Sequence, residues 1–318
     1  MEVVFINIEE YYQKSRLNNL QKKMEKNNVK WDTLFAIYQD YLNHQSDLQN
    51  VANLLNEKLK KAPNAHIAHF RVKDSIHLLD KVIRKKEEKD KTITKDNYWN
   101  EITDLIGIRI LHLYKEDWLK INNYIISQWE LNESPVANIR DGDNSDLYQE
   151  NDCEVHIHGA GYRSVHYHLI TNPSKQKYIV EVQVRTIFEE AWSEIDHDIR
   201  YPIHNNSSLV NALLMNFNRL AGFADEMGSY LKQLKFNIEE SEKAQQSELE
   251  EKEREISALK QEIQKLEIDA EDRSKITGLI DNIEYKPERN QDILKNISFS
   301  LPSYNFSLPK IDEKDGKI

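Results

Sequence analysis

Two stretches of the sequence alternate polar and apolar residues, and their polar positions carry side chains that can do chemistry. At strand spacing, GYRSVHYHL (161–169) presents on one face Tyr162, Ser164, His166 and His168. In the same way, KYIVEVQVRT (177–186) presents Glu181, Gln183 and Arg185 opposite a row of valines. The connecting TNPSKQ contains a proline turn and predicts an antiparallel hairpin, so both polar faces share one surface.

A phosphate-bearing ligand would explain this mixture of groups. Arg185 and Thr186 begin a predicted helix, where free N–H groups and the helix dipole favour phosphate oxygens. A carboxylate such as Glu181 suits a phosphate site only if it binds Mg²⁺ or takes a proton from a hydroxyl, and both roles occur in pyrophosphoryl transfer. Asp104, at the edge of the apolar run DLIGIRI, is the natural second carboxylate. The simpler alternatives are an ordinary half-exposed sheet, and a strand-end cap at Asp104.

Cations for such a ligand precede these strands in the chain. RVKDS (71–75) and Lys81 supply positive charge, and the planar guanidinium groups of Arg71 and Arg109 can stack on a nucleotide base. The residues therefore indicate a nucleotide site rather than a site for bare phosphate.

The spacing of apolar residues predicts the elements that carry these groups. Helical spacing indicates two or three helices between residues 8 and 62, and further helices at 75–89, 118–129 and 206–236. DLIGIRILHL (104–113) is a β-rich apolar run, and RDGDNSDLYQENDCE (140–154) predicts a polar loop. Thr186-x-x-Glu189 matches a capping box that starts another helix.

Composition limits the class of protein. The 318 residues include 8 glycines and 31% charged residues, which favours a largely helical protein. The net charge of −11 repels polyanions, so any nucleotide or RNA must bind in a local basic pocket. A single cysteine fits a reducing compartment, and no apolar run is long enough to span a membrane. We expect a cytoplasmic protein without a membrane partner.

Four motifs, in this order, resemble the signatures of the RelA/SpoT synthetase domain: DLIGIRI (104–110), GYRSVHYHL (161–169), VEVQVRT (180–186) and AWSEIDHDIRY (191–201). The resemblance extends from about residue 68 to 230. It implies an α+β fold, with a nucleotidyltransferase-like mixed β-sheet flanked by helices. It also implies a GTP diphosphokinase that transfers pyrophosphate from ATP to the 3′-hydroxyl of GDP or GTP and makes the alarmone (p)ppGpp. The first 65 residues are too few for the hydrolase domain of the long family members, so we expect synthesis without hydrolysis.

The resemblance also implies roles for individual residues. Asp104 would bind Mg²⁺, and Glu181 would bind Mg²⁺ or act as base for the 3′-hydroxyl. Arg71 and Arg109 would enclose the adenine of ATP. The ATP phosphates would be held by Lys73, Ser75 and Lys81. The acceptor nucleotide would meet Tyr162 as a stacking platform, together with Arg163, Ser164, His166, Gln183, Arg185 and His197. We expect His168 to be structural.

The sequence departs from the family pattern at two places. Ser75 follows Lys73 by two residues, a shorter spacing than is common in the family. The Lys-Asp-Tyr-Ile-like segment that usually precedes the Gly-Tyr motif is replaced by VANIRDGDNSDLYQEND (136–152), in which Arg140 could supply the lost cation.

Other functions compete with this hypothesis. Zinc binding is one, because a Cys-x-x-His-x-His cluster and two strand histidines lie close in sequence: Cys153, His156, His158, His166 and His168. The spacing fits no usual structural zinc site. A toxic relative that modifies adenine nucleotides or the 3′ end of tRNA is another, and RNA would need a local patch near Lys85, Lys86 and Lys89. The last is an inactive scaffold or sensor.

The C-terminal third predicts an extension rather than more catalytic domain. We divide the chain into a helical N-terminal region (1–64), the synthetase-like domain (65–235), a coiled-coil-like helix (236–275) and an extended regulatory or docking tail (276–318). Heptad positions between 249 and 270 suggest a homo-oligomer seam or a solvated helix: Leu249, Ile256, Leu259, Ile263 and Leu266. FSLPSYNFSLP (299–309) repeats Phe-Ser-Leu-Pro and is typical of an extended docking segment.

Overall fold

The computed structural model describes residues 6–200 and 207–281, which divide into two compact units. The first unit contains the described residues up to 228, and the second contains residues 229–281. Helix α9 (Ser208–Lys265) continues from one unit into the next, and α10 (Ala270–Asp281) belongs to the second.

The first unit is built on a six-stranded mixed sheet with strand order β1-β2-β6-β5-β3-β4. Its strands are β1 (Ile67–Val72), β2 (Ile106–His112), β3 (Val136–Ile139), β4 (Glu154–Ile157), β5 (Ser164–Thr171) and β6 (Tyr178–Thr186). The pairs β2–β6 and β3–β4 are parallel, and the other neighbours are antiparallel. The predicted α+β class, mixed sheet and β5–β6 hairpin are therefore confirmed.

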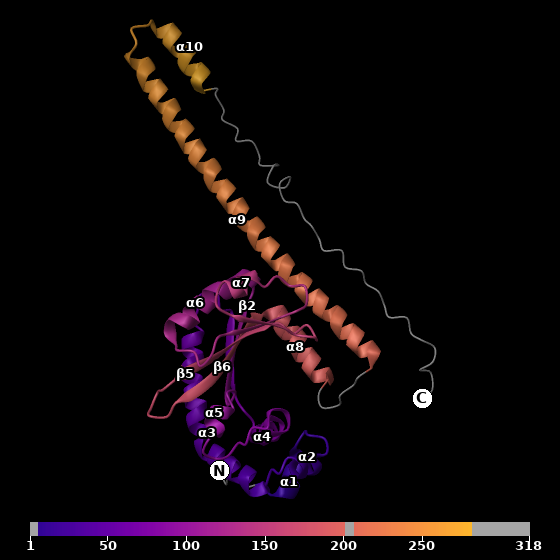
Figure 1. Ribbon diagram of the computed structural model, residues 1–318. Helices are drawn as coiled ribbons and strands as arrows, with labels where there is room; N and C mark the ends of the chain where they lie inside the picture. The colour runs from indigo at the N-terminus through magenta and orange to yellow at the C-terminus, as the bar shows by residue number, and fades with distance from the viewer. Residues whose placement is uncertain (1–5, 201–206, 282–318) are drawn as a thin grey trace, which may run out of the picture. The chain divides into compact units, whose positions relative to one another are not determined.

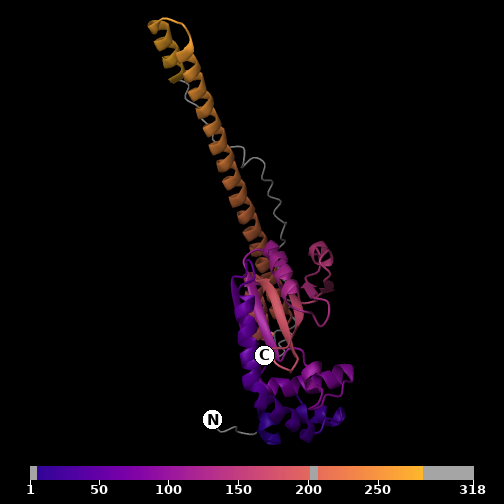
Figure 2. The same cartoon turned by 90° about the vertical axis from the view of Figure 1, so that its left-hand side faces the viewer.

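Helices cover both faces of this sheet, as Figure 1 shows for α3 and α6 on one side and α8 on the other. The helices before α9 are α1 (Ile8–Lys14), α2 (Leu20–Lys26), α3 (Trp31–Leu59), α4 (Ser75–Lys89), α5 (Tyr98–Glu101), the 3₁₀ turn η1 (Lys115–Asp117), α6 (Trp118–Gln128), α7 (Asp146–Gln149) and α8 (Ile187–Arg200). Figure 2 shows α3 from the side, running along the sheet. None of the described helices has the length and apolar content needed to cross a bilayer.

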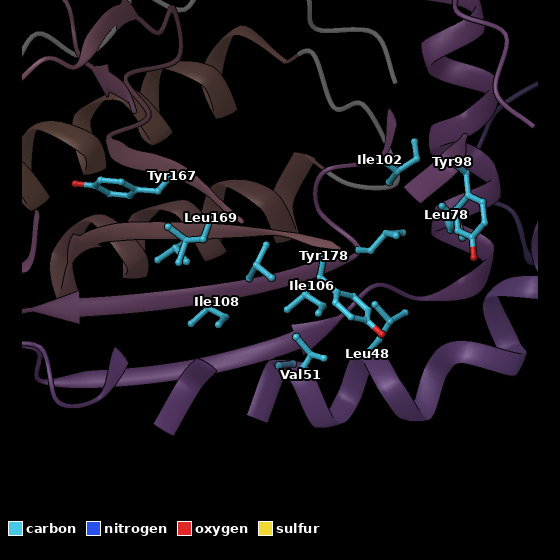
Figure 3. Close-up of a cluster of buried hydrophobic side chains, with 14 of the residues drawn as sticks. Leu48, Val51, Leu78, Tyr98, Ile102, Ile106, Ile108, Tyr167, Leu169 and Tyr178 are labelled. Atoms are coloured by element: carbon cyan, nitrogen blue, oxygen red, sulfur yellow. The ribbon is translucent and has the colours of Figure 1, made fainter. Parts of the chain in front are cut away.

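The core lies between the apolar face of the sheet and α3. Leu48 and Val51 of α3 pack beneath Ile106 and Ile108 of β2 (Figure 3). The valines of β6 continue this face and are buried: Val180, Val182 and Val184. Because side chains alternate along a strand, burial of this set directs the polar set to the opposite face.

Local signals set the ends of the helices that frame the polar face. Asp74 caps α4 by accepting hydrogen bonds from the backbone N–H groups of Ile76 and His77. The predicted capping box starts α8, since the Thr186 and Glu189 side chains each accept a hydrogen bond from the other's backbone N–H.

Several expectations were wrong in detail. The edge strands β1 and β4 and the short inner strand β3 were not predicted, because short half-exposed strands carry little apolar patterning. Residues 140–154 include helix α7 and the first residue of β4 rather than loop alone. The helix expected to end at 236 extends to 265, and residues 276–281 lie in α10 rather than in an extended tail.

The coiled-coil seam stays a prediction. Four of its five apolar positions lie on α9, whereas Leu266 follows the end of that helix. The repeat at 299–309 lies outside the described residues.

Candidate active site

The polar face of the central strands gathers the residues that the sequence singled out. In the β5–β6 pair, His166 is opposite Gln183 and His168 is opposite Glu181. In the parallel β2–β6 pair, Gly107 neighbours Glu181 and Arg109 neighbours Gln183. On the edge strand, Arg71 is opposite Gly107. The predicted common polar surface therefore exists and continues across four strands.

Asp104 lies at one end of this face between two lysines. Its carboxylate is 2.7 Å from Lys73 Nζ and 2.8 Å from Lys81 Nζ. Burial alone would raise the pKa of Asp104, but the two ammonium groups outweigh it and lower the pKa to about 2. Burial lowers the pKa of Lys73, and the charge of Asp104 offsets only part of this effect. Burial of the ammonium group of Lys73 is therefore unfavourable without Asp104.

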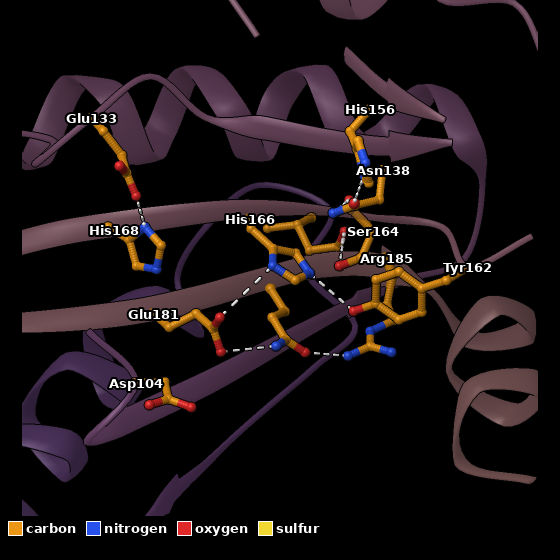
Figure 4. A network of polar contacts seen from close by, with 12 residues as sticks. Asp104, Glu133, Asn138, His156, Tyr162, Ser164, His166, His168, Glu181 and Arg185 are labelled. Carbon is orange, nitrogen blue, oxygen red and sulfur yellow. Dashed lines mark hydrogen bonds and ion pairs between the residues drawn. The ribbon is translucent and has the colours of Figure 1, made fainter. Parts of the chain in front are cut away.

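Glu181 lies at the same end of the β2–β6 pair as Asp104. Gly107 of β2 pairs with Glu181, and Asp104 lies three residues before Gly107 in the chain. Figure 4 shows both carboxylates in one view. Gln183 Nε2 donates a 2.9 Å hydrogen bond to Glu181 Oε2, which orients the carboxylate. The site therefore holds two carboxylates. Glu181 is oriented by Gln183, and Asp104 is paired with lysines.

A chain of polar contacts joins Glu181 to Tyr162 (Figure 4). His166 Nδ1 is 3.7 Å from Glu181 Oε1, and His166 Nε2 shares a 2.9 Å hydrogen bond with the Tyr162 hydroxyl. Burial lowers the pKa of His166 to about 4, against the pull of Glu181, so the imidazole is neutral near pH 7. Burial also raises the pKa of Tyr162, which keeps its hydroxyl protonated.

Arg185 completes the wall around Tyr162. Its guanidinium carbon lies 5.3 Å from the centre of the Tyr162 ring, and its Nη2 donates to Gln183 Oε1. Its Nε lies 3.1 Å from Glu190 Oε2. The side chain is almost completely buried and so has a fixed position.

Arg109 and Arg71 lie on the same face, as the resemblance implied. Together with Gly107, Glu181 and Gln183 they line a cavity of about 40 Å³. The carboxylates of Glu190 and Glu194 hold Arg109 at 2.9 and 2.5 Å. Burial opposes the charge of Arg109, but the two glutamates outweigh it and raise its pKa.

Three predicted site residues occupy less central positions. Ser75 is the first residue of α4, where Asp74 already caps the helix. Ser164 is buried and its hydroxyl donates a long 3.4 Å hydrogen bond to the backbone oxygen of Val184. His197 is exposed on α8, on the stripe that also carries Glu190 and Glu194.

Arg163 is placed away from the predicted acceptor site. Strand alternation turns it to the opposite side from Tyr162, where it is buried, with Nη2 3.4 Å from the Asn218 backbone oxygen and Nε 3.7 Å from Glu189 Oε1. With Arg140, which pairs with Asp143, it lines a cavity of about 490 Å³ that Ser164 and Arg185 also line. Arg163 lies beside Glu189 and Arg140 pairs with Asp143, and the roles expected for both arginines at the nucleotide site stay predictions.

The cysteine and histidines considered for zinc make other contacts. Cys153 is buried, and His156 hydrogen-bonds Asn138 Oδ1 at 3.1 Å. His168 pairs with Glu133, as expected for a structural residue. His158 packs against Tyr162 with ring centres 5.4 Å apart. Within residues 6–200 and 207–281, no three potential metal ligands from His, Cys, Asp and Glu converge.

Sequence reasoning missed two contributors, Glu190 and Glu194. Their signal was available, because an i, i+4 acidic pair at the start of the capped helix shares one stripe. The sequence did not show that this pair faces Arg109, because that depends on how α8 packs on the sheet.

The donor set fits Mg²⁺ in one specific way. Mg²⁺ is commonly bound by one or two carboxylates together with substrate phosphates and water. Asp104 and Glu181 supply two carboxylates, and Lys73 and Lys81 lie beside Asp104 as cations for phosphate. The residues present are therefore compatible with Mg²⁺.

The fold and the site define an α+β domain whose charged sheet face is suited to phosphate-bearing ligands. Residues 70–206 match the region found in RelA/SpoT proteins. The matched segment contains all four motifs that resemble the RelA/SpoT synthetase domain.

Solved structures with a similar fold include two from Bacillus subtilis. Small alarmone synthetase 1 is 18% identical over 63% of this chain and 98% of its own, with a TM-score of 0.47. The same protein bound to its product pppGpp is 20% identical over 61% of this chain and 97% of its own, with a TM-score of 0.47. A GTP pyrophosphokinase family protein from Streptococcus pneumoniae is 16% identical over 67% of this chain and 96% of its own, with a TM-score of 0.41. A comparison with curated protein sequences found no match.

Proposed function

We propose that this protein transfers the β,γ-pyrophosphate of ATP to the 3′-hydroxyl of GDP or GTP, in the cytoplasm and without hydrolysing the product. The RelA/SpoT region supports this reaction. The observation that carries it is the arrangement of Asp104, bound by Lys73 and Lys81, at the same end of the β2–β6 pair as Glu181. Pyrophosphoryl transfer needs both cations for phosphate and a carboxylate for the attacking hydroxyl.

The donor side consists of the arginines and lysines. Arg71 and Arg109 enclose the adenine, and Lys73 and Lys81 leave Asp104 to bind the phosphates. Asp104 would hold the Mg²⁺, which would offset the charge of the phosphate oxygens when bound, and Glu181 would be its second ligand in the alternative in which it is not the base. Ser75 has no support as a phosphate ligand beyond its place at the start of α4.

The acceptor side consists of Tyr162 and its neighbours. Tyr162 stacks on the guanine, while its hydroxyl bonds to His166 and the Arg185 guanidinium lies over its ring. Gln183 links Arg185 to Glu181. Glu181 takes the proton from the 3′-hydroxyl, whose oxygen bonds to the β-phosphorus of ATP. The bond from that phosphorus to the α,β-bridging oxygen breaks, and AMP leaves.

A labelled-substrate assay tests the proposal. The purified protein is incubated with γ-labelled ATP and Mg²⁺, and with GDP, GTP, an adenine nucleotide or bulk tRNA as acceptor. We expect label in guanosine nucleotides and a loss of at least about 100-fold in Glu181→Gln. The matched control Glu150→Gln removes an exposed carboxylate in the α7 region and should keep full turnover. Label in no acceptor, or full activity of Glu181→Gln, defeats the mechanism.

The tRNA arm of this assay covers the alternative acceptor. Lys85 donates to the Glu101 backbone oxygen and Lys86 pairs with Asp90, so two of the three lysines of this basic cluster are engaged in the structure. We therefore favour a nucleotide acceptor.

The second unit supports a regulatory proposal. We propose that the extension beyond residue 236 controls the synthetase by forming a homo-oligomer through 249–270 or by docking its tail. Removal of residues 237–318 should change either the mass of the particle in solution or the turnover. If mass and turnover per chain both stay the same, the extension has neither role.

A further inference from the structure

The two arginines that would enclose the base are held very differently. Arg109 Nη1 is fixed by two carboxylates from α8, Glu190 at 2.9 Å and Glu194 at 2.5 Å. Arg71 is exposed, and among the described residues no hydrogen bond or ion pair holds its guanidinium. Its side chain lies over Gly107, where an added Cβ would be 3.5 Å from Arg71 Cγ and Nε. The Arg109 side chain is therefore held in one position, whereas the Arg71 side chain is free to change its position.

Both arginines line one cavity of about 40 Å³, together with Gly107, Glu181 and Gln183. Only Arg71 is exposed, and only Arg109 is held there by carboxylates. A base that enters between the two guanidinium groups is therefore accommodated by movement of Arg71 rather than of Arg109.

The contacts of Arg109 suit stacking better than phosphate binding. A guanidinium donates hydrogen bonds from its edge and stacks through its face. Glu190 and Glu194 contact an edge nitrogen, so they orient the plane of the group. Their negative charge would also disfavour a phosphate at the same edge.

Glu190 has a second contact that Glu194 lacks. Its other oxygen, Oε2, is 3.1 Å from Arg185 Nε, and Arg185 lies over the Tyr162 ring. Glu190 therefore contacts both Arg109, which would stack on the donor base, and Arg185, which lies over the tyrosine proposed to stack on the acceptor base. Glu194 is half exposed and contacts Arg109 alone among these arginines.

We propose that Glu190 and Glu194 are positioning residues of the synthetase, with Glu194 orienting Arg109 for the donor base and Glu190 orienting both Arg109 and Arg185. This inference rests on the proposed function and adds specific residues to it. Neither glutamate touches the reacting atoms.

Steady-state kinetics separate the two roles. Glu194→Gln should raise KM for ATP about threefold and leave KM for the guanosine acceptor unchanged. Glu190→Gln should raise KM for both substrates. The matched control is Asp198→Asn, which removes the same charge one turn farther along the exposed side of α8 and should change neither value. A merely structural role would lower the active fraction and kcat without this split.

Direct binding keeps the inference testable even if no transfer is observed. Calorimetry with a non-transferable ATP analogue and with inorganic tripolyphosphate compares a ligand that has a base with one that has none. Glu194→Gln should weaken analogue binding about threefold and leave tripolyphosphate binding unchanged. Tighter binding of both ligands would mean that the carboxylate only repels polyanions, and that result overturns the inference. Analogue binding in a protein that transfers no label would defeat the proposed function instead.

Discussion

The ion pairs of Asp104 give the most direct quantitative prediction. Its side chain is 12% exposed, and the difference between its ordinary pKa of 3.8 and the lowered pKa of about 2 corresponds to about 2–3 kcal/mol at pH 7. This contribution is present above pH 4 and is lost as the pH falls through 2. Asp104→Asn removes it and leaves Lys73 buried without its partner. We therefore expect the variant to unfold with a free energy about 2–3 kcal/mol lower than the parent protein.

Urea unfolding at pH 7 without Mg²⁺, followed by tryptophan fluorescence, measures this difference. The second unit contains none of the five tryptophans, so the signal reports the sheet domain. Asp141→Asn, which removes an exposed carboxylate in the 140–145 loop, should leave the urea midpoint unchanged. An unchanged or raised stability of Asp104→Asn would refute the reasoning, because it would mean that desolvation cancels the lysine contacts.

Three further predictions concern groups around the same sheet. Burial and a neighbouring carboxylate raise the pKa of Asp225 to about 7, so Asp225→Asn should stabilise the domain by about 1–3 kcal/mol at pH 8 and by less at pH 5.5 in urea unfolding. Because His166 is neutral in the fold with a pKa of about 4, stability should fall as the pH drops from 6.5 towards 4; a pH series of unfolding midpoints should show a flatter dependence in His166→Gln. Tyr167 shares buried hydrogen bonds with Trp118 and Asn122, so Tyr167→Phe should cost about 1–3 kcal/mol, and an unchanged urea midpoint would contradict this.

The extent of sequence prediction differs between elements for physical reasons. Helix α4 and the β5–β6 hairpin were predicted within a few residues, since their signals are local: the helical spacing of apolar residues, a proline turn and an alternation of side chains. The edge strand β1 was missed because its half-exposed residues alternate weakly, and its stability comes from pairing with β2, about forty residues away. The ends of α9 and α10 were also missed, since polar helices have few local stop signals.

For the candidate site, the sequence by itself determined the types of side chain and the face that carries them. Strand alternation placed Glu181 and Gln183 beside His166, and the same alternation separates Arg163 from Tyr162. Only the tertiary structure decided which charges meet. Lys73 and Lys81 reach Asp104, and Glu190 reaches Arg109 and Arg185, because α4 and α8 pack against a sheet whose strands are far apart in the chain. Contacts of that kind depend on helix packing and on burial, and neither is encoded in the spacing of a single segment.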